Sequence, residues 1–202
     1  MISTALTLLI AATSILAFSN TELLNKLMFY PYLMNNNKGE WHRFIGHTFI
    51  HADWMHLIFN GIALYSFGGL VEQLLGPLKF LLLFFSAAVI SSVADYMKHK
   101  DNRYYRALGA SGSVAAIIFA SIIWEPWRGG IYMYFIPIPI PPIIFGVLYI
   151  AYSYYMSKRS SDNVAHNAHL YGALYGLLFT LLFLPNGLSN FLEKVINPSY
   201  AL

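Results

Sequence analysis

The chain has 202 residues, of which 12 are Lys or Arg and 9 are Asp or Glu. Charged residues make up 10% of the sequence and hydrophobic residues 57%, whereas a globular domain puts about 25% of its residues into charge. This composition excludes a disordered chain, which is highly charged and weakly hydrophobic. It also leaves too few charges to cover the surface of a soluble domain. The sequence therefore predicts an integral membrane protein.

Charge and cysteine content exclude several kinds of partner and site. The formal net charge is only +3, and no stripe of Lys and Arg interleaved with aromatic residues is present, so we expect no nucleic-acid partner. Cysteine is absent, which removes disulfides, thiolate nucleophiles and cysteine metal sites. We expect no cofactor.

Six apolar runs are long enough for transmembrane helices, each of which needs about 20 mostly apolar residues. Prolines between Pro137 and Pro142 confine the fifth helix to the end of its run, with an extended stretch before it. Gly68, Gly69 and the Gly76-Pro77 pair are expected to end the second helix. The predicted spans are 3–21, 54–71, 80–97, 107–124, 142–157 and 166–184.

The expected fold class is all-α, a polytopic membrane protein that forms one domain over residues 1–202. The first run is interpreted as a span rather than a signal peptide, because no basic region precedes it and its apolar part is long. The long first loop, residues 22–53, is rich in aromatic residues and is expected to lie in the membrane interface.

Polar side chains at membrane depth are costly and indicate function. Asp53 is a natural N-cap for the second span, which places His56 in the first turn. Asn60 follows four residues later, on the same helix face. Ser111 begins the fourth span within Gly109-Ala110-Ser111-Gly112, and His169 lies at the start of the sixth.

Spans two, four and six run in the same direction, so their N-terminal ends lie on one membrane face. His56, Asn60, Ser111 and His169 would converge there at similar depth if the three helices pack together. This set combines a nucleophile, a base and donors for an oxyanion. No acidic third member accompanies His169, so the pattern predicts a Ser–His dyad rather than a triad.

Each of these motifs also has a structural interpretation. The Gly-Ala-Ser-Gly motif is common at packed helix faces, and His56 with Asn60 could form an interhelical hydrogen-bonded pair. Gly172 and Gly176 are expected to let the sixth span approach a neighbouring helix closely. His47 with His51 and His166 with His169 have spacings that could bind a transition metal. No carboxylate or thiolate accompanies either pair, so we expect no metal site.

The basic residues are distributed unevenly between the two sides. Three lie on the loops after even-numbered spans, namely Lys79, Arg128 and Lys194. Nine lie on the loops after odd-numbered spans: Lys26, Lys38, Arg43, Lys98, Lys100, Arg103, Arg106, Lys158 and Arg159. By the positive-inside rule, the odd-numbered loops would face the cytoplasm.

The sequence resembles the rhomboid family of intramembrane serine proteases, in its minimal six-helix bacterial form. The resemblance is carried by His47 and His51 ahead of His56-x-x-x-Asn60, by Gly109-Ala110-Ser111-Gly112, by Ala168-His169-x-x-Gly172, and by Gly68-Gly69-Leu70-Val71-Glu72 with Gly76. It implies that Ser111 is the nucleophile and His169 the general base and acid. It also implies an oxyanion hole formed by His56, Asn60 and the Ser111 backbone N–H.

Two positions depart from the family pattern. His42 separates Trp41 from Arg43, where the family often has adjacent Trp-Arg. Ala115 replaces a tyrosine that stacks on the catalytic imidazole in many bacterial members. We therefore expect another aromatic residue, such as Tyr171 or Tyr175, to hold the His169 ring.

The function expected is that of an intramembrane serine endopeptidase. Its partners would be the lipid bilayer and the transmembrane segments of substrate proteins, and it would lie in a bacterial cell membrane. The resemblance places the site on the exterior face, opposite to the orientation that the basic residues favour. A catalytically inactive rhomboid-like binder of membrane proteins is the first alternative, and a small channel or metal transporter lined by histidines is the second. The sequence leaves the substrate and the oligomeric state open.

Overall fold

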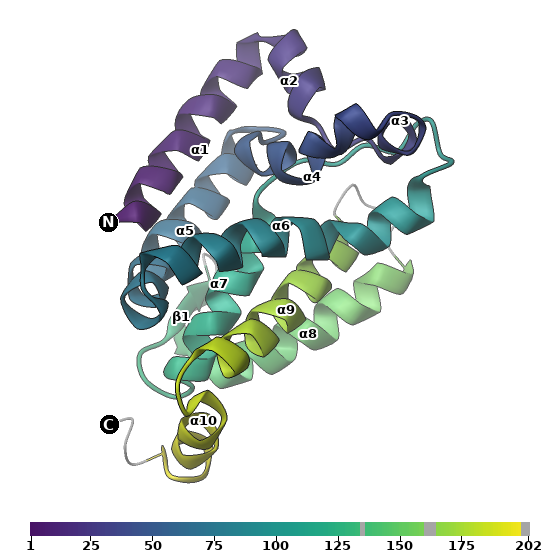
Figure 1. The fold of residues 1–202 in the computed structure, drawn as a ribbon. Helices are drawn as coiled ribbons and strands as arrows, with labels where there is room; N and C mark the ends of the chain where they lie inside the picture. Colours follow the sequence, from purple (N-terminus) through teal and green to yellow (C-terminus); the bar gives the residue numbers. More distant parts are fainter. Residues whose placement is uncertain (134–135, 160–164, 199–202) are drawn as a thin grey trace.

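The computed structural model describes residues 1–133, 136–159 and 165–198, and they are mostly helical (Figure 1). The longer helices are α1 (Ile2–Ser19), α5 (Trp54–Leu75), α6 (Pro77–His99), α7 (Ser111–Trp124), α8 (Pro142–Arg159) and α9 (His166–Phe183). Between α1 and α5 lie α2 (Thr21–Leu27), α3 (Pro31–Asn36), η1 (Lys38–His42), α4 (Arg43–Gly46) and η2 (His47–Phe49), where η marks a 3-10 helix. The antiparallel strands β1 (Ile131–Met133) and β2 (Ile136–Ile140) precede α8, and α10 (Gly187–Ile196) follows α9.

A helix lies at each of the six predicted ranges, but α5 does not end where expected. It continues through Gly68 and Gly69 to Leu75, and the break comes at Gly76, whose φ is +79°. The two inner glycines instead let α1 approach, since a Cβ on Gly68 would lie 3.0 Å from the Cβ of Ser3. Glu72 strengthens this contact, because its carboxylate accepts hydrogen bonds from the first backbone N–H groups of α1.

The start of α7 also differs from the prediction, because residues 107–110 are not helical. Ala107 pairs with Phe29 through two backbone hydrogen bonds, 2.9 and 3.1 Å long, which hold this stretch extended. Helix α7 therefore begins at Ser111 itself and has 14 residues.

By length and composition, α1, α5 and α6 could each cross a membrane. Helices α9 and α10 count as a fourth candidate only when taken together, and they are bent by 111°. Helix α7 is apolar but shorter. The described residues thus form a mostly helical integral membrane protein with three or four such candidates.

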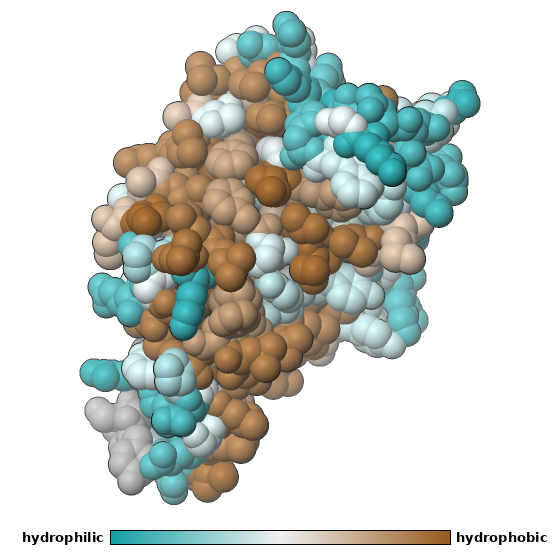
Figure 2. All heavy atoms as spheres, viewed as in Figure 1, coloured by the Kyte–Doolittle hydropathy of each residue, from teal (hydrophilic) through white to brown (hydrophobic). Residues whose placement is uncertain are grey.

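The outer surface is consistent with a lipid environment. Large apolar side chains are exposed on the long helices, among them Leu16, Ile62, Leu78, Leu82, Leu178 and Leu182. In Figure 2 hydrophobic residues cover the middle of the visible face over α6 and α9, and hydrophilic residues gather around α2 and α3. An apolar belt with a polar cap is the surface expected of a protein embedded in a bilayer.

The centre of the bundle is the contact between α7 and α9. Helix α7 is buried along nearly its whole length, with α6 and α9 packed beside it. A Cβ on Gly172 would lie 2.2 Å from the carbonyl oxygen of Gly112, and a Cβ on Gly176 would lie 2.2 Å from that of Ala116. Only glycine lets the two backbones come this close.

Helix α10 lies at the end of the bundle where α7 ends. One of its faces exposes Leu188, Leu192 and Ile196. The ammonium group of Lys194 donates a 2.6 Å hydrogen bond to the carbonyl of Trp124, the last residue of α7, and lies 4.2 Å from the centre of the Trp124 ring. A cation is favourable at this position because a helix ends in unpaired carbonyl groups.

We predict that Gly176→Ala destabilises the protein, because the added methyl group must push α7 and α9 apart. Overpacking of this kind costs about 1–3 kcal/mol, which should lower the midpoint of thermal unfolding measured in detergent. Gly61→Ala is the matched control, since it lies inside α5 with no atom within 4 Å of the added Cβ. Equal midpoints for the two variants would contradict the close contact.

Candidate active site

Asp53 sets the start of α5. Its side chain accepts a 2.8 Å hydrogen bond from the backbone N–H of His56, which confirms the predicted N-cap. Asn60 lies one turn further along and is buried, and its side-chain amide donates a 2.9 Å hydrogen bond to the His56 carbonyl. This bond uses one of the two amide hydrogens and leaves the other for a further acceptor.

Ser111 is the first residue of α7. Its backbone N–H therefore has no carbonyl partner within the helix. Gly109, two residues earlier, has a φ of +114°, and a Cβ there would lie 2.5 Å from the His56 ring. Glycine is thus needed both for this backbone conformation and for the imidazole that packs against it.

His169 lies in the first turn of α9, and its Nε2 lies 2.8 Å from the hydroxyl oxygen of Ser111. A serine hydroxyl donates to a neutral imidazole nitrogen, so this geometry corresponds to the tautomer with the proton on Nδ1. The two side chains are 58 positions apart in the sequence, and the contact between α7 and α9 brings them together.

A cavity of about 760 Å³ opens above this pair. Its lining includes all four predicted polar residues, namely His56, Asn60, Ser111 and His169. Most other lining side chains are apolar or small, such as Val114 and Ala115. The structure therefore brings the four residues to one space that a peptide segment and water can enter.

Two further histidines hold the backbone that precedes Ser111. The Nδ1 of His47 lies 3.2 Å from the Gly109 carbonyl, and the His47 carbonyl accepts a 2.9 Å hydrogen bond from the Gly109 N–H. His51 accepts a 3.3 Å hydrogen bond at Nε2 from the Ala110 N–H, and its Nδ1 lies 2.9 Å from the hydroxyl of Ser14. These histidines make hydrogen bonds suited to neutral rings, not metal contacts. In the described part of the chain, no three His, Asp or Glu side chains gather as a metal site would require.

Comparisons with known proteins identify the family of the chain. The Rhomboid domain model matches residues 38–186, which is well over half of the sequence. The chain belongs to the rhomboid family. RHOMBOID-like protein 12, mitochondrial, from Arabidopsis thaliana is 30% identical over 172 residues, which cover 77% of this rhomboid and 50% of the relative.

Two bacterial relatives show similar identity over shorter stretches. Rhomboid protease GlpG of Haemophilus influenzae is 32% identical over 119 residues, or 58% of each chain. Putative rhomboid protease YdcA of Bacillus subtilis is 31% identical over 83 residues, or 41% of each chain. This rhomboid thus spans about half the length of the relatives it matches.

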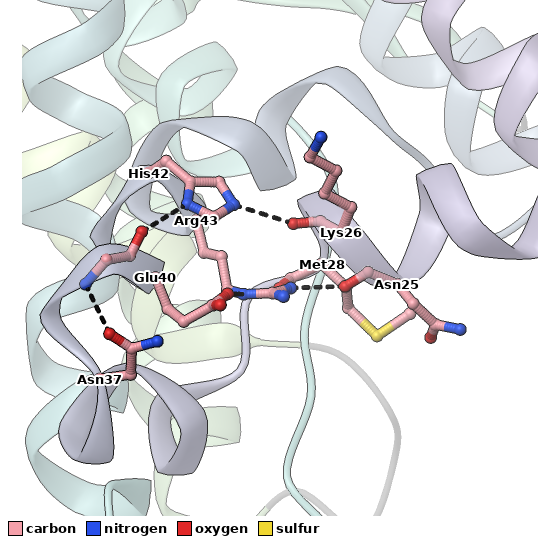
Figure 3. A network of polar contacts seen from close by, with 8 residues as sticks. Asn25, Lys26, Met28, Asn37, Glu40, His42 and Arg43 are labelled. Carbon is pink, nitrogen blue, oxygen red and sulfur yellow. Dashed lines mark hydrogen bonds and ion pairs between the residues drawn. The ribbon is translucent and has the colours of Figure 1, made fainter.

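The first loop of this rhomboid is held by Arg43, whose side chain is buried (Figure 3). The guanidinium group donates to the carbonyls of Asn25 and Met28, at 2.5 and 2.7 Å, and forms an ion pair with Glu40 at 2.6 Å. The inserted His42 does not displace Arg43, because its ring turns toward the carbonyls of Gly39 and Lys26 (Figure 3). The network fixes the loop that carries His47 and His51.

Tyr149 of α8 lies against the His169 ring, where Tyr171 or Tyr175 was expected, and the ring of His166 lies on another side with ring centres 6.1 Å apart. Tyr149 stacks on the imidazole with ring centres 6.3 Å apart and planes inclined by 24°. Tyr171 is exposed, and the hydroxyl of Tyr175 donates to Ser86. Both expected residues share the helix of His169 and project elsewhere around it. The sequence could not reveal Tyr149, because only tertiary packing decides which α8 residue reaches the site.

Burial makes the first loop of this rhomboid sensitive to acid. Burial lowers the pKa of His47 from 6.5 to about 4, and burial together with the nearby His56 lowers the pKa of His51 to about 3. Between these values and pH 6.5 the unfolded chain binds more protons than the folded protein. Stability is therefore complete above pH 6.5 and falls as the pH decreases toward 4.

We predict that the midpoint of thermal unfolding in detergent falls between pH 6.5 and 4.5, and that His47→Asn makes this fall less steep. Asparagine can still donate to the Gly109 carbonyl but does not titrate. The variant should also have a lower midpoint at pH 7.5, because one hydrogen bond to Ser92 is lost. Parallel curves for the wild type and the variant would contradict the role of His47 titration.

Proposed function

We propose that this rhomboid is an intramembrane serine endopeptidase that hydrolyses peptide bonds in or near transmembrane segments of other proteins. The observation that carries the proposal is the 2.8 Å contact between the Ser111 hydroxyl and His169 Nε2 at the floor of a cavity. Relatives named as rhomboid proteases support the same reaction class.

Ser111 would act as the nucleophile. A serine hydroxyl attacks an amide poorly until a base removes its proton, and neutral imidazole is suited to this step near pH 7. His169 Nε2 takes the proton as Oγ bonds to the scissile carbonyl carbon. The same nitrogen then donates that proton to the leaving amine as the C–N bond breaks, which leaves an acyl group on Ser111.

The oxyanion of each tetrahedral intermediate would be stabilised by three donors. These are the Ser111 backbone N–H, which begins α7, the second amide hydrogen of Asn60 and the His56 ring. Each such donor contributes about 3–4 kcal/mol in a site that excludes bulk water. The stacked Tyr149 ring would keep the imidazole aimed at the nucleophile during proton transfer.

Hydrolysis of the acyl group completes the reaction. One water molecule enters the cavity, His169 takes one of its protons, and the hydroxide adds to the acyl carbon. The collapse of this second intermediate returns the proton to Ser111 and releases a carboxylic acid. A substrate helix must expose its backbone to reach the serine, so helix-breaking residues should favour cleavage.

A topology with six spans fits this mechanism. The N-terminal ends of α5, α7 and α9 all line one cavity, so the chain must return across the bundle between them. Helix α6 makes the first return and α8 the second. With α1 before them, these helices make six crossings, and α7 is the short one.

The host membrane and the orientation belong to the same proposal. Relatives come from bacteria and, by name, from mitochondria, and we retain a bacterial cell membrane with the cavity open to the exterior. The nine basic residues on that side are offset in part by Asp101.

We predict that Ser111→Ala abolishes cleavage of a transmembrane substrate and prevents labelling by a fluorophosphonate probe, because no other group can take over the nucleophilic attack. His56→Ala and Asn60→Ala should each lower kcat about 100-fold or more, with smaller changes in KM, because oxyanion donors act mainly in the transition state. Cleavage and probe labelling by purified protein in detergent measure both effects.

Gly61→Ala serves as the control, since it lies on the same helix as His56 and Asn60 but meets no neighbouring atom. Cleavage retained by Ser111→Ala would disprove the mechanism. A wild-type protein that binds substrate but neither cleaves it nor reacts with the probe would instead be a rhomboid-like binder.

We predict that a membrane-impermeant maleimide labels Asn102→Cys but not Ser189→Cys in intact cells. Both positions are exposed, Asn102 on the side of the cavity and Ser189 on α10. The chain has no native cysteine, so each variant carries one target. The reverse labelling pattern would place the cavity on the cytoplasmic side, as the basic residues favour.

A further inference from the structure

A buried carboxyl group lies near the active site but takes no part in the mechanism above. Asp95, in the last part of α6, is 3% exposed. Within the described part of the chain, the side chains that line the cavity do not include it. Ionisable groups at membrane depth are expensive and point to a function.

The two partners of Asp95 lie on the two segments that carry the dyad. The side-chain amide of Asn167 donates a 2.9 Å hydrogen bond to its Oδ1. Tyr105 is the second neighbour of the carboxyl group, and the charge of Asp95 helps to raise the pKa of its hydroxyl. Asn167 precedes His169 by two residues in the first turn of α9. Tyr105 precedes Ser111 by six residues in the loop that leads into α7.

His99 keeps the tyrosine in place. Its ring stacks on the Tyr105 ring with centres 3.7 Å apart and planes inclined by 2°. Burial and the neighbouring Asp95 raise the pKa of Tyr105, so its hydroxyl remains a hydrogen-bond donor at any physiological pH. Hydrogen bonds to a carboxylate are stronger than those between neutral groups, and a medium of low dielectric strengthens them further.

We propose that Asp95 is a positioning residue that sets the orientation of His169 toward Ser111, because it holds Asn167 of α9 beside the loop that leads into α7. This inference rests on the proposed function. The glycine contact fixes the register of α7 against α9 from Gly112 and Gly172 onward, and the first turn of α9 that carries His169 precedes Gly172. Asp95 ties this first turn to a third helix, α6.

Single substitutions of the partners provide the test. Asn167→Ala removes the hydrogen bond to Asp95, and Tyr105→Phe removes the hydroxyl group beside the carboxyl group; both leave the dyad and the cavity lining unchanged. A displacement of about 1 Å between reacting groups can cost about 100-fold in rate, so we expect each variant to lower kcat on the order of tenfold with KM unchanged within about twofold. The rate of fluorophosphonate labelling of Ser111 should fall in parallel.

Substitution of Asp95 itself should give a larger loss. Asp95→Leu removes the hydrogen bond to Asn167 and the polar group beside Tyr105, and should lower kcat at least as much as the two partner variants combined. Asp95→Asn should keep most of the activity, because its Oδ1 can still accept the hydrogen bond from Asn167. If Asp95→Leu fails to fold, the partner variants and Asp95→Asn still decide the question.

Asp101→Asn is the control, since it removes an exposed carboxyl group from the loop between α6 and α7 that also carries Tyr105. The inference is overturned if the partner variants keep the wild-type kcat, even when their unfolding midpoints fall, or if Asp101→Asn lowers kcat equally. Failure of the proposed function looks different, because then the wild type itself neither cleaves nor labels, or Ser111→Ala still cleaves.

Discussion

At two positions the backbone of α9 touches the backbone of α7, and no side chain lies between them. Gly172 meets Gly112, the residue next to Ser111, and Gly176 meets Ala116 one turn further along. Because neither helix can slide or rotate without a clash, the register of the contact fixes where the first turn of α9 lies relative to the first residue of α7. The 2.8 Å separation of Ser111 and His169 depends on this register.

Groups around the dyad hold the backbone that precedes Ser111, which the glycine contact does not reach. His47 and His51 bind the backbone of Gly109 and Ala110 from the first loop, and Arg43 holds that loop in turn. These contacts make the first loop part of the site, although it contributes no side chain to the proposed chemistry. Because both histidines are buried as neutral rings, the stability of this part of the structure falls in acid.

Local signals made much of the fold and the site predictable. The apolar composition and the N-cap at Asp53 depend on few neighbouring residues, and the structure agrees with them. Of the six predicted spans, three of the helices, or four when α9 and α10 are taken together, are long and apolar enough to cross a membrane. The expected break at Gly68 and Gly69 is wrong, because a glycine that ends a helix and one that lets another helix approach look the same in sequence. The positions of Tyr149 and Asp95 depend on how α6 and α8 pack against α9, which no local pattern encodes.

The attachment of α10 has a consequence for the thickness of the bilayer. Lys194 fastens the last residue of α7 to a helix that turns by 111° away from α9, so α7 is anchored at the side opposite the cavity. Its 14 residues rise only about 21 Å, whereas the hydrocarbon core is about 30 Å thick. The distance of Ser111 from the membrane face opposite the cavity is therefore set by the length of α7. A thicker membrane would leave the dyad unchanged but would lengthen the path that water must travel to reach it.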